Sequence, residues 1–160
     1  PKWARKKQIP GLEDCYLVRT GAGVAVRETR RIVGEYVLTE EDAVKGAEFD
    51  DVVARKYGAI DAVHYIAPMK SGFAYPYRSL LPKRVDHLLV AGRCGSATHL
   101  GHAAGKSMGN MMDLGQAAGV AAALSCKMAV PPRELNVKEI QKVLLEMGVP
   151  LFPSGKASVE

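Results

Sequence analysis

The sequence predicts an α/β fold, and three stretches carry that prediction. Residues 88–91 are a short apolar run closed by Gly92, which is typical of a buried strand followed by a tight turn. Residues 115–124 are mostly small or aliphatic and favour a helix that packs closely against its neighbour. Between them lies a loop rich in Gly, Ser and His. Ligands of α/β proteins bind beyond the carboxyl ends of strands, often at the start of a helix, so we expect the chemistry in this loop.

The composition is that of one globular domain. The chain has 160 residues, of which 48% are hydrophobic and 24% are charged, enough for a single core. Its formal net charge is +5, and four basic side chains stand within residues 2–7. A basic start is typical of chains that bind nucleic acid or acidic membranes, but aromatic residues are sparse and no nucleic-acid-binding signature follows. We therefore expect a solvated lead-in and no nucleic-acid partner.

Cysteine usage and hydropathy favour the cytoplasm. Cys15, Cys94 and Cys126 are widely spaced and form no CxxC pair, so the sequence predicts neither a metal site nor a disulfide framework. The longest apolar run, residues 117–124, is too short to span a bilayer, and no signal peptide is visible. The chain starts at Pro1 rather than Met, from which we expect a processed protein, a subunit or a fragment.

The first half of the chain is expected to be mainly extended after an irregular lead-in at residues 1–10. The predicted strands cover residues 15–20, residues 24–38 with a break at Gly34, and residues 60–66, where apolar and polar side chains alternate. Thr39 is a good N-cap, and three acidic residues follow it where the helix dipole favours negative charge. A short helix over residues 40–45 is therefore predicted, stopped by Gly46, with another helical piece over residues 49–56.

The second half is expected to contain two longer helices. The first starts near Gly109, with Asn110 as a plausible N-cap. The second covers residues 136–147, where apolar side chains recur at helical spacing after the cap Asn136. The predicted irregular stretches are the loop at residues 68–77, the lead-in at 78–82, the break at Pro131 and Pro132, and the tail at 150–160.

Two nucleotide-binding patterns are nearly present. Residues 101–107 resemble a phosphate-binding loop, but three residues rather than four separate Gly101 from Gly105, and no strand precedes them directly. Residues 21–23 (Gly-Ala-Gly) begin a dinucleotide fingerprint whose third glycine position holds Val26. A phosphate-loop NTPase is therefore disfavoured, and these residues would hold a Rossmann-type cofactor only in part.

The start of the helix near Gly109 is a candidate ligand site. Free N–H groups and the positive end of the helix dipole suit an anionic or electron-rich group, although simple capping explains Asn110 equally well. Small residues recur at helical spacing after it and permit the close approach of either a packed sheet or a flat cofactor. These residues are Gly115, Ala118, Gly119 and Ala122.

A polar cluster fills the loop before this helix. Its members are Arg93, Ser96, Thr98, His99, His102 and Lys106. Catalytic groups usually sit on such loops, and histidine acts as an acid or base near neutral pH. Each member alone is more typical of a surface, so it is the density of the cluster that favours a functional site.

Arginines gather in a second place, upstream of this cluster. Arg27 and Arg31 share a face in either a helix or a strand. Arginine suits fixed contacts with carboxylate or phosphate, and pairing with Glu28 on an exposed edge is the alternative.

Five blocks of the sequence, in this order, resemble one protein family. They are residues 26–39 (VRETRRIVGEYVLT), 75–82 (YPYRSLLP), 88–94 (LLVAGRC), 96–99 (SATH) and 115–119 (GQAAG). Together they resemble the C-terminal part of the FAD-dependent oxidoreductase family, within the glutathione-reductase-like flavoproteins. That superfamily includes fumarate reductase flavoproteins and the flavin subunits of heterodisulfide reductases. The resemblance covers roughly residues 10–145.

The resemblance implies a partial FAD/NAD(P)-binding domain of the α/β class. In that family an N-terminal Rossmann part with a GxGxxG motif grips the ADP half of FAD. Here the resemblance implies that an N-terminal FAD-binding portion or a partner subunit supplies it. The implied division is a lead-in at residues 1–14, the C-terminal portion of the FAD-binding domain at 15–148, and a tail at 149–160.

The resemblance also implies roles for single residues. The helix starting near Gly109 would aim its N-terminus at the flavin, where the reduced ring carries negative charge. The implied FAD contacts are the backbones of Gly92, Arg93, Gly109, Asn110 and Met111. We expect His99 to transfer protons or orient the substrate. The expected substrate anchors are Arg30, Arg78 and Lys106. Just before this helix, where this chain has Lys106, the relatives often carry an arginine-containing run. Either Lys106 takes the role of that arginine or the substrate is different.

The expected function is two-electron redox of a small organic substrate by FAD, in an enzyme of which this chain is one portion or subunit. The isolated chain is expected to be inactive. The alternative is a non-catalytic scaffold or binding subunit of a larger flavoprotein complex. The sequence does not decide whether the protein forms a homo-oligomer.

Overall fold

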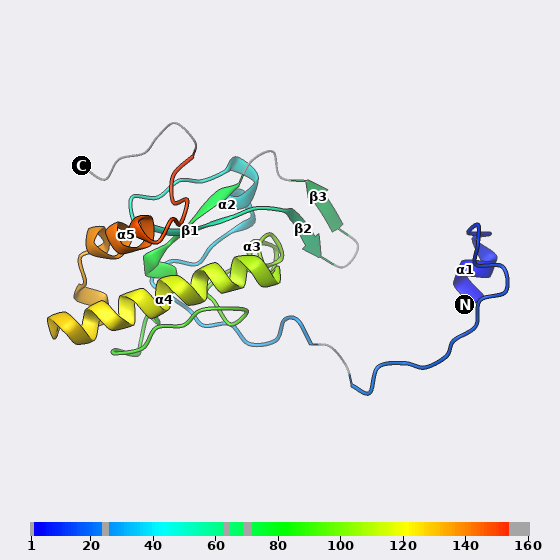
Figure 1. Ribbon diagram of the computed structural model, residues 1–160, viewed down its shortest axis with the longest axis horizontal. Helices are drawn as coiled ribbons and strands as arrows, with labels where there is room; N and C mark the ends of the chain where they lie inside the picture. Colours follow the sequence, from blue (N-terminus) through cyan, green and yellow to red (C-terminus); the bar gives the residue numbers. More distant parts are fainter. Residues whose placement is uncertain (1, 24–25, 63–64, 69–71, 154–160) are drawn as a thin grey trace.

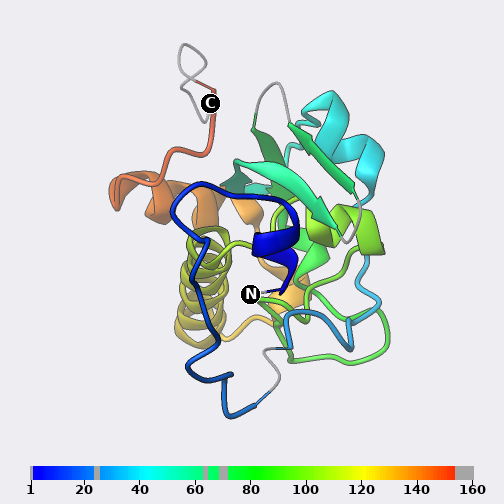
Figure 2. The same cartoon turned by 90° about the vertical axis from the view of Figure 1, so that its right-hand side faces the viewer.

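The computed structural model describes residues 2–23, 26–62, 65–68 and 72–153. An N-terminal arm carries the short helix α1 (Lys2–Lys6) away from the rest of these residues (Figure 1). The elements of the body are α2 (Glu40–Lys45), β1 (Val52–Lys56), β2 (Ala59–Ala62), β3 (Tyr65–Pro68), β4 (Phe73–Pro76), η1 (Tyr77–Ser79), α3 (His99–Ala103), α4 (Met108–Met128), η2 (Pro132–Glu134) and α5 (Val137–Glu146). Figure 2 looks nearly along α4 and shows the strands gathered to one side of it. Helices and strands mix as an α/β fold requires.

The core is built on β1, every residue of which is buried. β1 pairs antiparallel with β4, with Lys56 opposite Phe73, and α4 and α5 pack against it. The predicted helix over residues 49–56 is therefore wrong, and the predicted loop at 68–77 contains part of β3 and all of β4. Arg55 and Lys56 look like the charged face of a helix in the sequence, but strand pairing with a distant segment buries both.

β2 and β3 form a second antiparallel pair. The predicted alternation is confirmed in β2, where Ile60 and Ala62 are buried and Asp61 is exposed. The single strand expected over residues 60–66 instead divides between β2 and β3, and residues 63–64 lie outside the described residues. The exposed Asp61 lies next to the polar loop, because its carbonyl oxygen accepts from the Lys106 ammonium.

Helices α2 and α5 confirm the predictions made from their caps. Thr39 Oγ1 accepts from the backbone N–H of Asp42, and the Asp42 carboxylate accepts from the backbone N–H of Thr39, at 3.3 and 2.8 Å. Gly46 ends α2 at a φ of 66°, a left-handed conformation that favours glycine. Asn136 caps α5 by accepting from the backbone N–H of Lys138.

Helix α4 starts at Met108, one residue before the predicted start near Gly109. Its N-cap is Ser107, so the prediction of Asn110 as cap is wrong. The Asn110 side chain turns into the protein instead and donates to the Tyr57 carbonyl oxygen at 3.1 Å. The side chains that α4 buries are Asn110, Leu114, Ala117, Val120 and Ala121. The residues Gly115, Gly119 and Ala122 of the small-residue face are exposed, and Ala118 is half-buried.

Three predicted strands are absent from the described residues. Residues 15–20 and 88–91 belong to no strand of the described chain, and the stretch at 24–38, described from residue 26 onward, forms only isolated bridges. A strand needs a neighbour along its length, whereas residues 88–91 pair at one point, where Val90 donates to the Leu80 carbonyl oxygen at 2.9 Å. Gly92 nevertheless makes the predicted turn, with a φ of 88°.

Candidate functional site

A cavity of about 560 Å³ opens where three segments of the chain meet. The first segment lies between residue 27 and residue 31, the second is the end of β2, and the third runs from the start of α3 to the loop before α4. Most of the side chains around the cavity are charged. The lining residues are Arg27, Glu28, Thr29, Arg31, Asp61, Ala62, His99 and Lys106.

Asp61 holds one side of the cavity together. Its carboxylate accepts from the Arg27 guanidinium at 2.7 Å, and its backbone carbonyl accepts from the Lys106 ammonium at 2.5 Å. The hydrogen bond from Arg27 lowers the pKa of the Asp61 carboxyl, so this carboxylate is charged near neutral pH. The side chains of Arg27 and Asp61 are about half exposed, which leaves the pair open to exchange with a ligand.

Glu28 organises the other side. One of its carboxylate oxygens lies 2.9 Å from Nδ1 of His99 and also pairs with the Arg31 guanidinium. His99 is the first residue of α3, whose N-cap Thr98 accepts from the backbone N–H of Gly101 at 3.1 Å. The His99 ring is therefore fixed at its base by a capped helix and at Nδ1 by a carboxylate, while most of its surface remains accessible.

The field in the cavity is positive. Burial lowers the pKa of the Lys106 ammonium, and the nearby charges of Arg27 and Arg93 lower it further. Burial also lowers the pKa of His102 to about 4, and the charges of Lys56, Arg31 and Lys106 act in the same direction. His102 is thus neutral at physiological pH, and its buried Nε2 has no hydrogen-bond partner among the described residues.

Lys56 supports the loop before α4 from below. Its side chain is 2% exposed, its ammonium lies 4.0 Å from the centre of the Tyr75 ring, and it donates to the Gly105 carbonyl oxygen at 3.5 Å. Burial lowers its pKa to about 7. A Cβ on Gly105 would lie 2.3 Å from the Lys56 stem, so the loop approaches this closely only because residue 105 is glycine.

A second hollow, of about 310 Å³, lies at the start of α4 and is lined by Arg93, Met108, Met111 and Met112. The Ser107 side chain makes no capping hydrogen bond to the first turn within the described residues, so backbone N–H groups there remain free. A Cβ on Gly109 would meet no atom of the described chain within 4 Å. The hollow thus combines free donors, open space and soft methionine side chains.

A hydrogen bond links the linings of the two hollows, which share no described residue. Arg93, from the lining of the second hollow, donates through Nε to the carbonyl oxygen of Lys106, whose side chain lines the first, at 3.3 Å. The backbone of residue 106 therefore separates a cationic cavity from the open first turn of a long helix.

Comparison with known families identifies the chain. A family model described as FAD dependent oxidoreductase matches residues 4–144. The chain belongs to the FAD-dependent oxidoreductase family. The prediction of FAD as the cofactor is confirmed by this match. Searches of curated proteins and of solved structures gave no match.

The start of α4 fits the flavin of an FAD-dependent oxidoreductase. Reduced flavin carries negative charge on one edge, which the uncapped N–H groups and the dipole of a 21-residue helix would stabilise. Of the predicted contacts, Arg93 and Met111 line the hollow and Gly109 lies open at its helix turn. The Asn110 side chain is turned inward, which leaves only its backbone for a cofactor.

The predicted substrate anchors separate in space. Lys106 lines the cationic cavity. Arg30 is exposed and does not line it, whereas Arg27 and Arg31 do. Arg78 lies elsewhere, since it pairs with Asp51 at 3.3 Å and lies over the Tyr36 ring. Arg78 therefore contributes to packing around α2 rather than to the cavity.

Four residues of the cavity were not predicted as site residues, although the sequence indicated two arginines among them as suited to carboxylate or phosphate. They are Arg27, Glu28, Arg31 and Asp61. A signal for the two arginines is present in the sequence, because residues four apart face one way in a helix or a strand. Asp61 gave no such signal, because its partners Arg27 and Lys106 lie far from it in the sequence. No cluster of His, Cys, Asp and Glu in the described residues could hold a metal ion.

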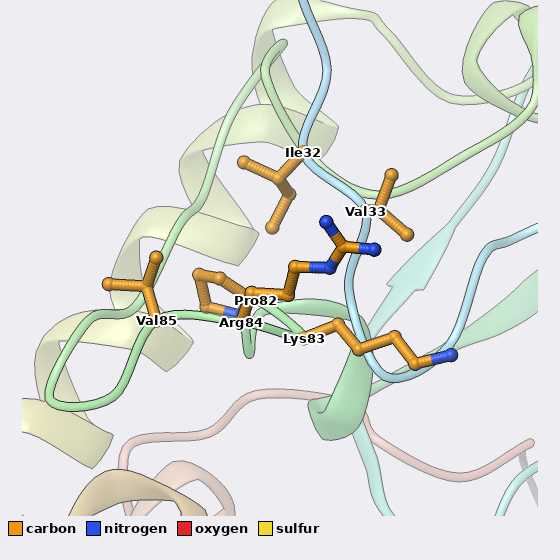
Figure 3. A pocket seen from close by; sticks show the side chains of 6 residues that line it. All are labelled: Ile32, Val33, Pro82, Lys83, Arg84 and Val85. Carbon is orange, nitrogen blue, oxygen red and sulfur yellow. The ribbon is translucent and has the colours of Figure 1, made fainter.

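A third hollow, of about 520 Å³, is of a different kind. It is lined by Ile32, Val33 and residues 82–85, and Figure 3 shows the aliphatic side chains of Ile32, Pro82 and Val85 around it, with the Arg84 guanidinium beside Val33. This lining contains no acid or histidine that could transfer a proton. This hollow therefore differs in character from the two hollows whose linings are linked by Arg93 and Lys106.

Proposed function

We propose that this chain forms the flavin-facing and substrate-facing side of the redox site of an FAD-dependent oxidoreductase. In this proposal the flavin lies against the start of α4 and a small organic substrate occupies the cationic cavity. The contact between Arg93 and the backbone of Lys106 carries the proposal, because it makes the two hollows neighbours. A redox enzyme needs its cofactor and its substrate in such contact.

Each side chain then has a distinct task. FAD supplies two-electron redox chemistry when it is bound. The free N–H groups at the start of α4 stabilise negative charge beside them, and Arg93 adds a positive charge to the same hollow. His99 holds or moves the proton that accompanies electron transfer, with Glu28 fixing its Nδ1. Lys106 and the two arginines of the cavity orient the substrate.

We further propose that an N-terminal FAD-binding portion or a partner subunit completes the grip on FAD, in the cytoplasm. Two observations support this part. Residues 21–23 begin a dinucleotide fingerprint that Val26 interrupts. Residues 88–91 have the sequence of a buried strand, but among the described residues they make one backbone hydrogen bond, Leu88 is exposed and residues 89–91 are half-buried, so a strand of the completing portion fits beside them.

A non-catalytic scaffold or binding subunit of a larger flavoprotein complex is the second candidate. The exposed small-residue side of α4, with Gly115 and Gly119, favours it, because such a surface permits another element to pack closely. In that case the hollow at the start of α4 would be covered by protein rather than by a flavin.

The absorption spectrum of the purified chain, alone and with any polypeptide that co-purifies, distinguishes the two. A flavin band that accompanies the protein, alone or only together with a partner, supports the redox function. A complex that forms with a partner but carries no flavin overturns it and supports the scaffold. Addition of FAD to the stripped complex, followed by gel filtration, controls for loss of the cofactor during purification.

A further inference from the structure

We infer that the cavity between Arg27, Arg31, His99 and Lys106 binds a small monocarboxylate, which is the substrate class of the proposed redox site. The name "substrate" rests on the proposed function, whereas the binding itself does not. The inference goes beyond the flavin side of the site and concerns the charged lining of the cavity.

Charge is the first reason. Among the described residues, the lining holds the three cations Arg27, Arg31 and Lys106 against the two carboxylates of Glu28 and Asp61, which leaves one positive charge unbalanced. Burial is the main cause that lowers the pKa values of Lys106 and the buried His102, and the neighbouring cations add to it in the same direction. A ligand with a single negative charge balances the cavity, whereas a phosphate dianion overcompensates it.

Geometry is the second reason. The cations already hold carboxylates, since the Arg27 guanidinium lies 2.7 Å from a carboxylate oxygen of Asp61 and the Glu28 carboxylate accepts from both Arg31 and His99. Arginine presents paired donors that match the two oxygens of a carboxylate. A ligand carboxylate therefore meets donors that are set for its shape.

Exchange is the third reason. Arg27 and Asp61 are 51% and 53% exposed in their side chains, and ion pairs at such exposure contribute little to stability. The Lys106 ammonium donates to a backbone carbonyl rather than to a carboxylate, so its charge remains available. A ligand carboxylate can thus take the place of Asp61 on Arg27 and add a contact to Lys106 without unfolding the site.

Benzoate and benzamide test the inference, because they have the same shape and differ by one charge. Each is titrated into the full ¹⁵N-labelled chain, without flavin, and followed by amide chemical shifts. We expect benzoate to shift the signals around residues 27–31, His99 and Lys106, and we expect benzamide to leave them unchanged. Inorganic phosphate, at the same ionic strength, is expected to bind at least about tenfold more weakly than benzoate.

Variants localise the site. Arg27→Gln combined with Lys106→Gln is expected to weaken benzoate binding at least about tenfold, and Arg27→Gln alone serves if the double variant does not fold. The matched control is Lys138→Gln with Lys142→Gln, which removes the same charge from the exposed face of α5 and is expected to leave the affinity unchanged.

Three results would overturn the inference: equal binding of benzamide and benzoate, tighter binding of phosphate, or equal weakening by the control pair. The outcome is separable from that of the proposed function. A chain that binds benzoate at this cavity but never carries flavin keeps the carboxylate site and loses the redox function. A chain that carries flavin but does not bind benzoate keeps the redox function and loses the carboxylate site.

Discussion

Nδ1 of His99 lies 2.9 Å from a carboxylate oxygen of Glu28, although 71 positions separate the two residues. The side chain of His99 is 60% exposed and that of Glu28 is 15% exposed. The carboxylate is therefore the fixed partner, and the imidazole is the group that a ligand in the cavity can reach. Arg31 holds the same carboxylate from its own position three residues along the chain.

Replacing His99 tests this division of roles. His99→Gln is expected to change the free energy of unfolding by less than about 0.5 kcal/mol, because the ring is exposed. It is expected to slow substrate-dependent flavin reduction or reoxidation by about 10²- to 10⁴-fold, the usual contribution of a positioned proton-transfer group. Stopped-flow absorbance of the flavin measures the rate, and urea unfolding measures the stability.

Replacing Glu28 is expected to lower the stability more than replacing His99 does. Glu28→Gln removes the charge that holds both Arg31 and His99, so we expect a loss of about 1 kcal/mol in the free energy of unfolding. The same urea unfolding experiment measures it. A larger loss in the free energy of unfolding for His99→Gln than for Glu28→Gln would contradict the assignment of Glu28 as the fixed partner.

Lys56 gives the protein a pH-dependent stability. Its pKa is lowered to about 7 in the folded chain, from a usual value near 10.5, so between these pH values the unfolded chain binds more protons than the folded chain. The stability therefore rises with pH across this window, and the cost of the buried charge is fully present below it. Lys56→Met keeps the stem and removes the charge.

This variant is expected to be more stable at pH 7, by about 1–4 kcal/mol, and to lose the rise in stability between pH 7 and 10. Urea unfolding of both proteins at several pH values measures the difference, which cancels the titration of groups common to both. A rise of equal size in Lys56→Met would show that other groups cause it.

Two glycines of similar appearance in the sequence are expected to respond oppositely to alanine. A Cβ on Gly101 would lie 2.4 Å from the Leu38 carbonyl oxygen, and backbone cannot yield as a flexible side chain does. Gly101→Ala is therefore expected to destabilise the protein by about 1–3 kcal/mol. Gly109→Ala meets open space in the first turn of α4 and is expected to stabilise by about 0.4–1 kcal/mol, because alanine restricts the unfolded chain. Thermal unfolding by circular dichroism compares the two.

Local signals decided which elements could be predicted from the sequence. The caps Thr39 and Asn136 define α2 and α5, because a cap and its helix lie within a few residues of each other. β1 was not predictable in this way, since its partner β4 lies beyond β2 and β3 in the chain and its last residues, Arg55 and Lys56, are charged. Burial of those charges is a property of the fold and not of the local pattern.

The same difference between local signals and distant contacts applies to the candidate site. The helix start near Gly109 and the polar loop with His99 and Lys106 could be found, because Gly, Ser and His are concentrated there. The partners Glu28 and Asp61 reach the loop from segments far away in the sequence, through hydrogen bonds that no local pattern encodes. Asn110 shows the converse, because its capping preference is overridden by a hydrogen bond to the distant Tyr57 carbonyl oxygen.

The flavin midpoint potential of two variants at Gly109 tests the central claim most directly. Gly109→Asp places a carboxylate in the first turn of α4, where it favours the helix but opposes negative charge on a neighbouring flavin, and Gly109→Asn is the uncharged match. We predict a potential at least about 30 mV more negative for the flavin-loaded Gly109→Asp protein than for Gly109→Asn, at equal or greater thermal stability. Equal potentials in the two variants would contradict the placement of the flavin at the start of α4.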